Sequence, residues 1–221
     1  MLEATSAFKR NNLAAQPCEA LLMTYTLRRY QSYQDYLDDD QLRHEDNYRL
    51  LSTGKLIEVS SEDEENLWLA NVLIAALLQV RGIPFLKLIR PGNKELQVNP
   101  VGDKRVNRKP DVLVMRPEHR QAARQAVKLG MAAPEFVAEV VSPGNESSDN
   151  YLRDYVWKRQ QYQEWQIPEY WIIDPHRAQI TVLTLTDQVY RETVYQGDTR
   201  IVSSVFPSLE LTANKLLSGD I

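Results

Sequence analysis

The chain has 221 residues, enough for one full-sized domain, and its 43% hydrophobic and 25% charged residues are typical of a globular protein rather than a disordered one. Its 26 basic and 30 acidic side chains leave a net charge of −4, which excludes a protein that holds polyanions by bulk charge but permits a local basic groove. The single cysteine, Cys18, excludes an internal disulfide and a thiolate zinc site, as expected in a reducing cytosol.

Neither a membrane span nor an export signal is predicted. The most apolar run, residues 67–80, is too short to cross a bilayer and contains Asn71 and Gln79. Charged residues such as Glu3 and Lys9 interrupt the region where a signal peptide requires an unbroken apolar stretch. We therefore expect a cytoplasmic protein without a membrane partner.

The N-terminal part is predicted to be an arm, residues 1–43, with a short helix within the aromatic stretch 25–37. The remaining residues, 44–221, are predicted to form the main domain. This domain begins with alternating polar and apolar residues over 48–59, and Thr53-Gly54 supplies a turn. That pattern predicts an N-terminal β-hairpin.

The middle of the chain mixes helical and strand patterns. Four acidic residues at 62–65 precede apolar residues at helical spacing over 67–79, which predicts a helix whose positive end faces the acids. Short strands are expected at 84–89 and 111–116, and a helical connection at 121–128.

The last part of the chain contains the strongest patterns. A buried strand is predicted at 135–141, a helix at 149–165, a strand at 169–174 and a C-terminal hairpin from 179–186 with 188–195. This order of elements predicts an α/β (α+β) fold with a central mixed β-sheet flanked by helices.

Glu139 is the most unusual residue, because it lies within the otherwise apolar segment 136–141. An ionised carboxylate in such a place costs several kcal/mol unless a cation or hydrogen bonds compensate. One interpretation is an edge strand whose polar face meets water. The other is a carboxylate that binds a metal or handles a proton.

Asp111 is the second candidate and follows Lys109-Pro110 at the start of a strand. Alone it is typical of a turn. If it lies beside Glu139, the two carboxylates can share a magnesium ion, which uses one or two carboxylates, waters and a substrate phosphate. Glu58, in the first hairpin, adds a third acid if its side chain turns inward, or is an ordinary solvent-facing strand residue.

The helix over 149–165 places Asp154, Lys158 and Tyr162 on one face, with Arg153 beside them. A charged helix face is usually only solvated. A lysine close to two carboxylates and a phosphate, however, can orient a water or neutralise developing negative charge.

A block of basic residues precedes Asp111. In a chain of net charge −4 it is either a solvated loop or a local site for a phosphodiester backbone. With Arg153 from the following helix, the candidate nucleic-acid-binding residues are Lys104, Arg105, Arg108 and Lys109.

Several motifs, in this order, resemble one known family. They are Gly54-Lys-Leu-Ile-Glu-Val, Arg108-Lys-Pro-Asp-Val, Glu139-Val-Val-Ser-Pro-Gly, Lys158 with Tyr162, Glu169-Tyr-Trp-Ile-Ile-Asp-Pro and Phe206-Pro-Ser-Leu-Glu-Leu. Together they resemble the PD-(D/E)XK nuclease superfamily, and within it a family named for restriction endonucleases and abundant in cyanobacteria. The resemblance covers roughly residues 48–217.

The resemblance implies a restriction-endonuclease-like core and assigns roles. Asp111 and Glu139 would bind magnesium or manganese, with the Val140 carbonyl as a further ligand. The superfamily's lysine normally stands two residues after the acid, where this chain has Val141. The resemblance implies that the lysine has moved to the following helix, so that Lys158 would orient the attacking water.

The resemblance also implies accessory roles for Glu58, Asn66 and Tyr162. We therefore expect a metal-dependent endonuclease that hydrolyses DNA phosphodiester bonds, and a homodimer, because two-fold dimers are common and suit a nuclease that cuts both strands. The alternatives are a catalytically inactive module of the same fold that binds nucleic acid or protein, and another reaction on a phosphate ester.

Overall fold

The computed structural model describes residues 28–42, 48–59 and 63–221. Its helices, in chain order, are α2 (Tyr33–Leu37), α3 (Glu64–Arg81), the 3₁₀-helix η1 (Ile83–Leu88), α4 (His119–Ala122), α5 (Asp149–Tyr151), the π-helix η2 (Leu152–Trp157), α6 (Lys158–Glu164) and α7 (Ala213–Ser218). Because α5, η2 and α6 follow one another directly, they form one continuous helix.

The strands are mostly short in the first half of the chain and longer in the second. They are β1 (Tyr48–Leu50), β2 (Leu56–Glu58), β3 (Ile89–Arg90), β4 (Glu95–Gln97), β5 (Asn107–Arg108), β6 (Val112–Val114), β7 (Ala126–Val127), β8 (Phe136–Val140), β9 (Glu169–Asp174), β10 (Gln179–Thr186) and β11 (Val189–Gln196).

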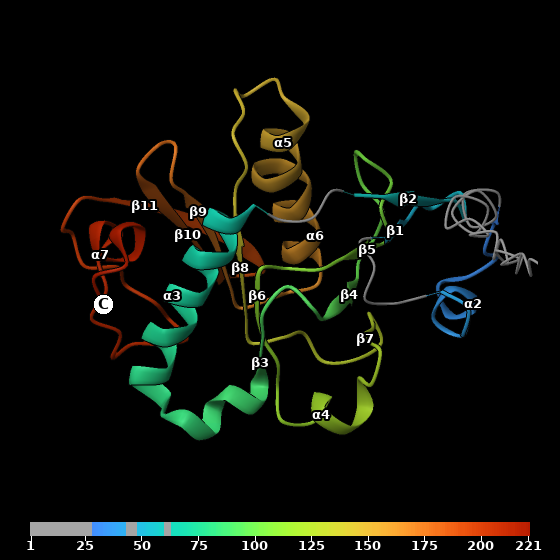
Figure 1. Ribbon diagram of the computed structural model, residues 1–221, viewed down its shortest axis with the longest axis horizontal. Coiled ribbons are helices and arrows are strands. Elements are labelled where there is room, and N and C mark those ends of the chain that lie inside the picture. The colour runs from blue at the N-terminus through green and yellow to red at the C-terminus, as the bar shows by residue number, and fades with distance from the viewer. Residues whose placement is uncertain (1–27, 43–47, 60–62) are drawn as a thin grey trace, which may run out of the picture.

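A six-stranded mixed sheet forms the centre of the molecule, with the strand order β11-β10-β9-β8-β6-β3 (Figure 1). Strands β8 and β9 are parallel, and the other neighbours in this sheet are antiparallel. The smaller sheets are the hairpin β1-β2 and the three-stranded sheet β5-β4-β7. The predicted mixed α/β architecture is therefore present, including a hairpin near each end of the described chain.

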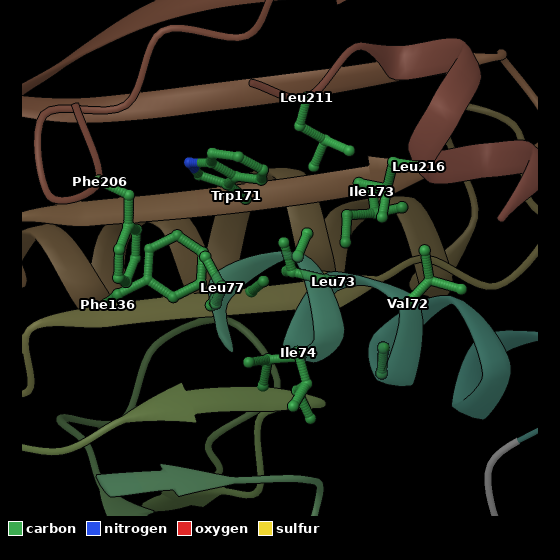
Figure 2. Packing of buried hydrophobic residues seen from close by; sticks show 14 of the residues in the cluster. Val72, Leu73, Ile74, Leu77, Phe136, Trp171, Ile173, Phe206, Leu211 and Leu216 are labelled. Atoms are coloured by element: carbon green, nitrogen blue, oxygen red, sulfur yellow. The ribbon is translucent and has the colours of Figure 1, made fainter. Parts of the chain in front are cut away.

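Helices α3 and α7 cover one face of the central sheet. Leu73 and Leu77 of α3 pack against Phe136 of β8 and Trp171 of β9, as Figure 2 shows. The rings of Phe136 and Trp171 meet edge to face with centroids 5.5 Å apart. At about 25 cal/mol for each Å² of apolar surface buried, the packing of this layer stabilises the sheet.

The continuous helix α5–η2–α6 covers the opposite face. Tyr162 and Trp165 pack there with Val137 of β8 and Ile172 of β9. Because successive strand residues face opposite sides, Phe136, Ala138 and Val140 lie in the α3 layer, and the residues between them turn toward α6.

The first hairpin is closed by a turn that requires glycine. Gly54 has a φ of +79°, and a Cβ at this position would lie 2.2 Å from the Tyr30 carbonyl oxygen. The backbone amide of Tyr30 in turn donates to the Gly54 carbonyl. The hairpin also contacts the segment leading into β5, since the Val106 amide donates to the Leu50 carbonyl.

Two predicted elements differ from the structure, and a third region contains strands that were not predicted. The strand expected at 84–89 is instead the 3₁₀-helix η1 followed by the short strand β3, because a short apolar run does not distinguish strand from helix and Pro84 favours a helical start. The connection expected to be helical at 121–128 contains α4 and then β7. The polar stretch before Asp111 contains β4 and β5, which pair with residues distant in sequence.

The helix expected within 25–37 is α2, preceded by non-helical residues 28–32; residues 25–27 lie outside the described part. It lies with the β1-β2 hairpin at one end of the molecule, and α7 lies at the other (Figure 1). In the part of the chain that the structure describes, no helix has the length and apolar character needed to cross a bilayer.

Candidate active site

Asp111 and Glu139 lie side by side on neighbouring strands. Antiparallel pairing of β6 with β8 sets Val112 opposite Ala138. Asp111, which precedes Val112, therefore lies next to Glu139, which follows Ala138. An oxygen of the Asp111 carboxylate accepts a hydrogen bond from the Val140 amide at 2.7 Å. Both acids are buried, with exposed fractions of 7% for Asp111 and 1% for Glu139.

Strand alternation directs Glu139 toward the helix α5–η2–α6. Its neighbours Val137 and Val141 belong to the hydrophobic layer under that helix. The Tyr162 hydroxyl donates to Glu139 Oε1 at 2.6 Å, and burial together with the Glu139 carboxylate raises the pKa of Tyr162 well above its usual value. Tyr162 therefore stays protonated and acts as a fixed donor to Glu139.

Lys158 lies between two buried carboxylates. Its Nζ is 2.9 Å from Glu139 Oε2 and 2.7 Å from Asp154 Oδ1. Two close ion pairs compensate for the removal of three charges from water, which would otherwise cost several kcal/mol for each ion. The edge-strand interpretation of Glu139 is thus wrong, because β8 is an interior strand and the carboxylate is paired.

Asp154 belongs to this cluster although it was not predicted as a site residue. Burial acts to raise its pKa, but the neighbouring Lys158 and Arg153 cations outweigh burial and lower it. Arg153 pairs with Asp154 through its guanidinium at 2.9 Å. The available sequence signal was the four-residue spacing of Asp154 and Lys158, which places both on one helix face.

The π-helix η2 carries Asp154 within the continuous helix. Such π-segments widen the helix locally and are frequent at functional sites. The Tyr170 hydroxyl of β9 donates to the Asp154 carbonyl at 3.0 Å, which satisfies a backbone acceptor in this segment. The backbone of η2 is therefore tied to the sheet next to the acid–lysine cluster.

A polar cavity of about 680 Å³ opens over this cluster. Charged and polar side chains from several elements line it. They are Arg49, Glu58, Asp63, Glu65, Asn66, Arg105, Arg108, Lys109, Asp111, Glu139, Ser142, Asn150, Arg153, Lys158 and His176, together with Val59, Val140 and Pro143.

Four of the five predicted basic residues line this cavity. Arg105, Arg108, Lys109 and Arg153 line it, whereas Lys104 is exposed and is not among the lining residues. Arg108 is buried, and its guanidinium forms two hydrogen bonds with the Asp103 carboxylate at 2.9 and 3.0 Å.

A third hydrogen bond joins Arg108 to Gln161 of α6. These contacts identify Arg108 as a residue that joins the loop before β5 to α6. Arg108 also lines the cavity, and its predicted role in binding nucleic acid remains a prediction.

Besides Tyr162, the predicted accessory residues are Glu58 and Asn66, which occupy different positions. Glu58 ends β2, is exposed and lies on the cavity lining. Asn66, in the first turn of α3, also lines the cavity but is only 6% exposed. Within the described residues its side chain has no hydrogen-bond partner, so its amide is available to a ligand in the cavity.

The donor set suits a hard divalent cation. No three histidine, cysteine, aspartate or glutamate side chains in the described ranges form a group able to hold a metal alone. Asp111 and Glu139 nevertheless provide two adjacent carboxylates beside a polar cavity. Mg²⁺ is usually bound by one or two carboxylates and completes its octahedral shell with water and substrate phosphate, so these residues fit it.

The fold and the site define a mixed α/β protein whose acid–lysine cluster lies at the ends of two interior strands of its central sheet, below a charged cavity. A family model described as "Putative restriction endonuclease", the Uma2 family, matches residues 30–214. The chain belongs to this family.

A solved structure shares the fold. It is the crystal structure of a "putative nuclease belonging to DUF820" from Anabaena variabilis ATCC 29413, which is 15% identical to this chain. The match has a TM-score of 0.55 and covers 79% of this chain and 91% of that chain. No curated protein matches the chain.

Proposed function

We propose that the protein is a metal-dependent endonuclease that hydrolyses DNA phosphodiester bonds on a restriction-endonuclease-like core. One observation carries this proposal: Lys158 is paired with Glu139, which lies beside Asp111 at the base of a charged cavity. The description of the Uma2 family supports the same reaction. The three side chains are the types that phosphodiester hydrolysis with a metal requires.

Asp111, Glu139 and the Val140 carbonyl would hold Mg²⁺ or Mn²⁺. When bound, the ion supplies positive charge for the phosphate oxygens and makes water a better nucleophile. The chain's part in this is rigidity, because Asp111 is held by the Val140 amide and Glu139 by Tyr162. Ligands held by such second contacts bind metal more tightly than mobile ones.

Lys158 would orient the attacking water and offset negative charge at phosphorus. An ammonium has three N–H donors, and the ion pairs with Glu139 and Asp154 engage two of them. Lys158 therefore retains capacity for a water or a phosphate oxygen. Glu58 and Asn66 would act as accessory residues from the cavity lining.

The DNA backbone would contact the basic side chains of the lining, Arg105, Lys109 and Arg153. Exposed Lys104 would add a contact beyond it. A two-fold homodimer would place two such sites on opposite strands of a duplex. Sedimentation equilibrium tests the homodimer, with a mass of twice 25.5 kDa as the expected result.

The test is cleavage of supercoiled plasmid and short oligonucleotides in Mg²⁺, Mn²⁺ or chelator. We expect metal-dependent nicking by the wild type and none by Glu139→Gln. Lys158→Met should lower the rate by about 10² to 10³, the usual effect of losing one group that stabilises charge in the transition state.

Two residues outside the cavity provide matched controls. Arg159 lies on α6, the helix of Lys158, and Glu192 lies on β11, an edge strand of the central sheet. Arg159 pairs with Glu192 at the surface, so Arg159→Met and Glu192→Gln remove the same kinds of charge without reaching the cavity. Both should cut like the wild type. If neither the wild type nor any variant cuts, and the wild type and the folded variants bind nucleic acid equally, the nuclease proposal fails. The alternative, a catalytically inactive module of the same fold that binds nucleic acid, is then favoured.

A further inference from the structure

Arg49 is a buried arginine that the sequence patterns did not single out. It lies in β1, is 8% exposed and lines the charged cavity. One guanidinium nitrogen donates to the Tyr48 carbonyl at 2.9 Å. A guanidinium has five N–H donors, so this bond engages only a small part of its capacity.

No carboxylate forms an ion pair with Arg49 within the described ranges, which sets it apart from other cations of the cavity. Arg108 is paired with Asp103, Arg153 with Asp154 and Lys158 with Glu139. A buried cation without a paired anion is unfavourable for folding alone. Its retention is therefore better explained by an anionic ligand.

The two acids whose charges act on Arg49 are already engaged by other groups. Burial lowers the pKa of Arg49, while the charges of Glu95 and Glu139 act in the opposite direction. Glu95 accepts hydrogen bonds from the hydroxyls of Tyr33 and Tyr36 at 2.7 and 3.0 Å. Glu139 is held by Tyr162 and Lys158, so neither acid neutralises Arg49 directly.

Asn66 gives a second and independent indication. It is buried, lines the same cavity and has no side-chain partner among the described residues. A cationic donor on β1 and a neutral donor on α3 thus line the same cavity as Asp111 and Glu139. Phosphate oxygens accept from both kinds of donor.

We propose that Arg49 binds a backbone phosphate of the DNA substrate in the cavity that Lys158 also lines. The inference rests on the proposed function, which it extends with a substrate-positioning residue. The planar guanidinium can hold two oxygens of one phosphate at once, which a lysine cannot. Arg49 would hold the backbone in place while Lys158 acts at the scissile phosphate.

The experiment measures binding of a fluorescein-labelled duplex by anisotropy in EDTA, where no metal-dependent cutting occurs. Arg49→Gln should weaken binding about tenfold or more and reduce the slope of log affinity against log salt by about one. Arg49→Lys keeps the positive charge but loses the planar guanidinium. Its affinity for the duplex should lie between those of the wild type and Arg49→Gln. Arg159→Gln removes an arginine outside the cavity and should bind like the wild type.

Thermal unfolding separates a ligand-binding role from a structural one. Inorganic phosphate in EDTA should raise the Tm of the wild type but not that of Arg49→Gln. Without phosphate, Arg49→Gln should unfold at the same or a higher temperature, because it removes an unpaired buried charge. If Arg49→Gln does not fold, Arg49 has a structural role and the inference is overturned unless Arg49→Lys folds with a wild-type Tm and weakened DNA binding.

The outcomes distinguish this inference from the nuclease proposal. If the wild type cuts plasmid and Arg49→Gln binds DNA and phosphate as the wild type does, Arg49 has no such role and the nuclease stands. If no metal supports cutting but Arg49→Gln still loses DNA and phosphate binding, the anion-binding role stands and hydrolysis fails.

Discussion

At the scale of single residues, the site is a chain of buried charges that support one another. Glu139 is held by Tyr162 and Lys158, and Lys158 is held in turn by Asp154. Removing one partner from a buried ion pair costs much more than the pair contributes, because the remaining charge is left in an apolar environment. Each member is therefore needed for the geometry of the others.

Asp154→Asn tests this dependence through pH. The pKa of Asp154 is lowered below its ordinary value of 3.8, so its contribution to stability is fully present above that value and is lost as pH falls through the lower folded-state pKa. At pH 7 the variant should lose about 3 kcal/mol of unfolding free energy in urea. The gap to the wild type should shrink below about pH 4.

The control for Asp154→Asn is Glu192→Gln, which removes a surface carboxylate paired with Arg159. Its unfolding free energy should stay within about 0.5 kcal/mol of the wild type at each pH. A difference between Asp154→Asn and the wild type that is constant from pH 7 to pH 3 would show that the ion pairs do not stabilise the fold.

At the scale of elements, the helix α5–η2–α6 carries half of the site and must be held against two different parts of the structure. Tyr162 and Trp165 attach it to the central sheet. Trp157 contacts the loop between β4 and β5, where Gly102 approaches its indole ring. That loop also carries Asp103, whose carboxylate holds Arg108.

Gly102→Ala tests this contact between helix and loop. A Cβ on Gly102 would lie 2.0 Å from the Trp157 indole nitrogen, so the loop or the helix has to shift. We expect a loss of about 1–3 kcal/mol in chemical denaturation, the usual cost of overpacking. Gly130→Ala is the control, since a Cβ there meets nothing within 4 Å, and its stability should change little. Equal stability of both variants would contradict the contact.

At the scale of the whole molecule, the segment with α2 packs on the body rather than lying apart from it. Tyr36 and Leu37 share a hydrophobic cluster with Tyr48 and Leu50 of the first hairpin and Ala126 of β7. The hydroxyls of Tyr33 and Tyr36 also hold Glu95 of β4. The division into an arm, 1–43, and a domain, 44–221, remains a prediction. It implies that the two parts unfold separately.

Tyr36→Ala tests whether the arm and the domain unfold together. Tyr36 is 1% exposed, so its truncation should cost about 3–5 kcal/mol. If the chain is one cooperative unit, its single calorimetric transition shifts to lower temperature as a whole. An unchanged main transition would instead support an independent arm. Gln34→Ala, on the exposed side of α2, should leave the transition in place.

The elements with strong local patterns were predictable from sequence. The strand 169–174 coincides with β9, and the helix over 149–165 corresponds to α5–η2–α6. Local periodicity determines such elements because one face of each is buried. The π-helix η2 was not predicted; it contacts a segment distant in sequence through the Tyr170 hydroxyl, which donates to the Asp154 carbonyl, and local periodicity does not encode such contacts.

By itself, the sequence determined the candidate acids, Asp111 and Glu139, and the lysine that reaches Glu139. Carboxylates beside apolar strands, and a lysine at helical spacing from another acid, are local features. Only the tertiary structure decided which cations are neutralised: Arg108 is paired, whereas Arg49, on a hairpin distant in sequence, faces the cavity. Ion pairing and burial depend on which distant segments of the chain meet in the fold. The local sequence pattern does not encode these contacts.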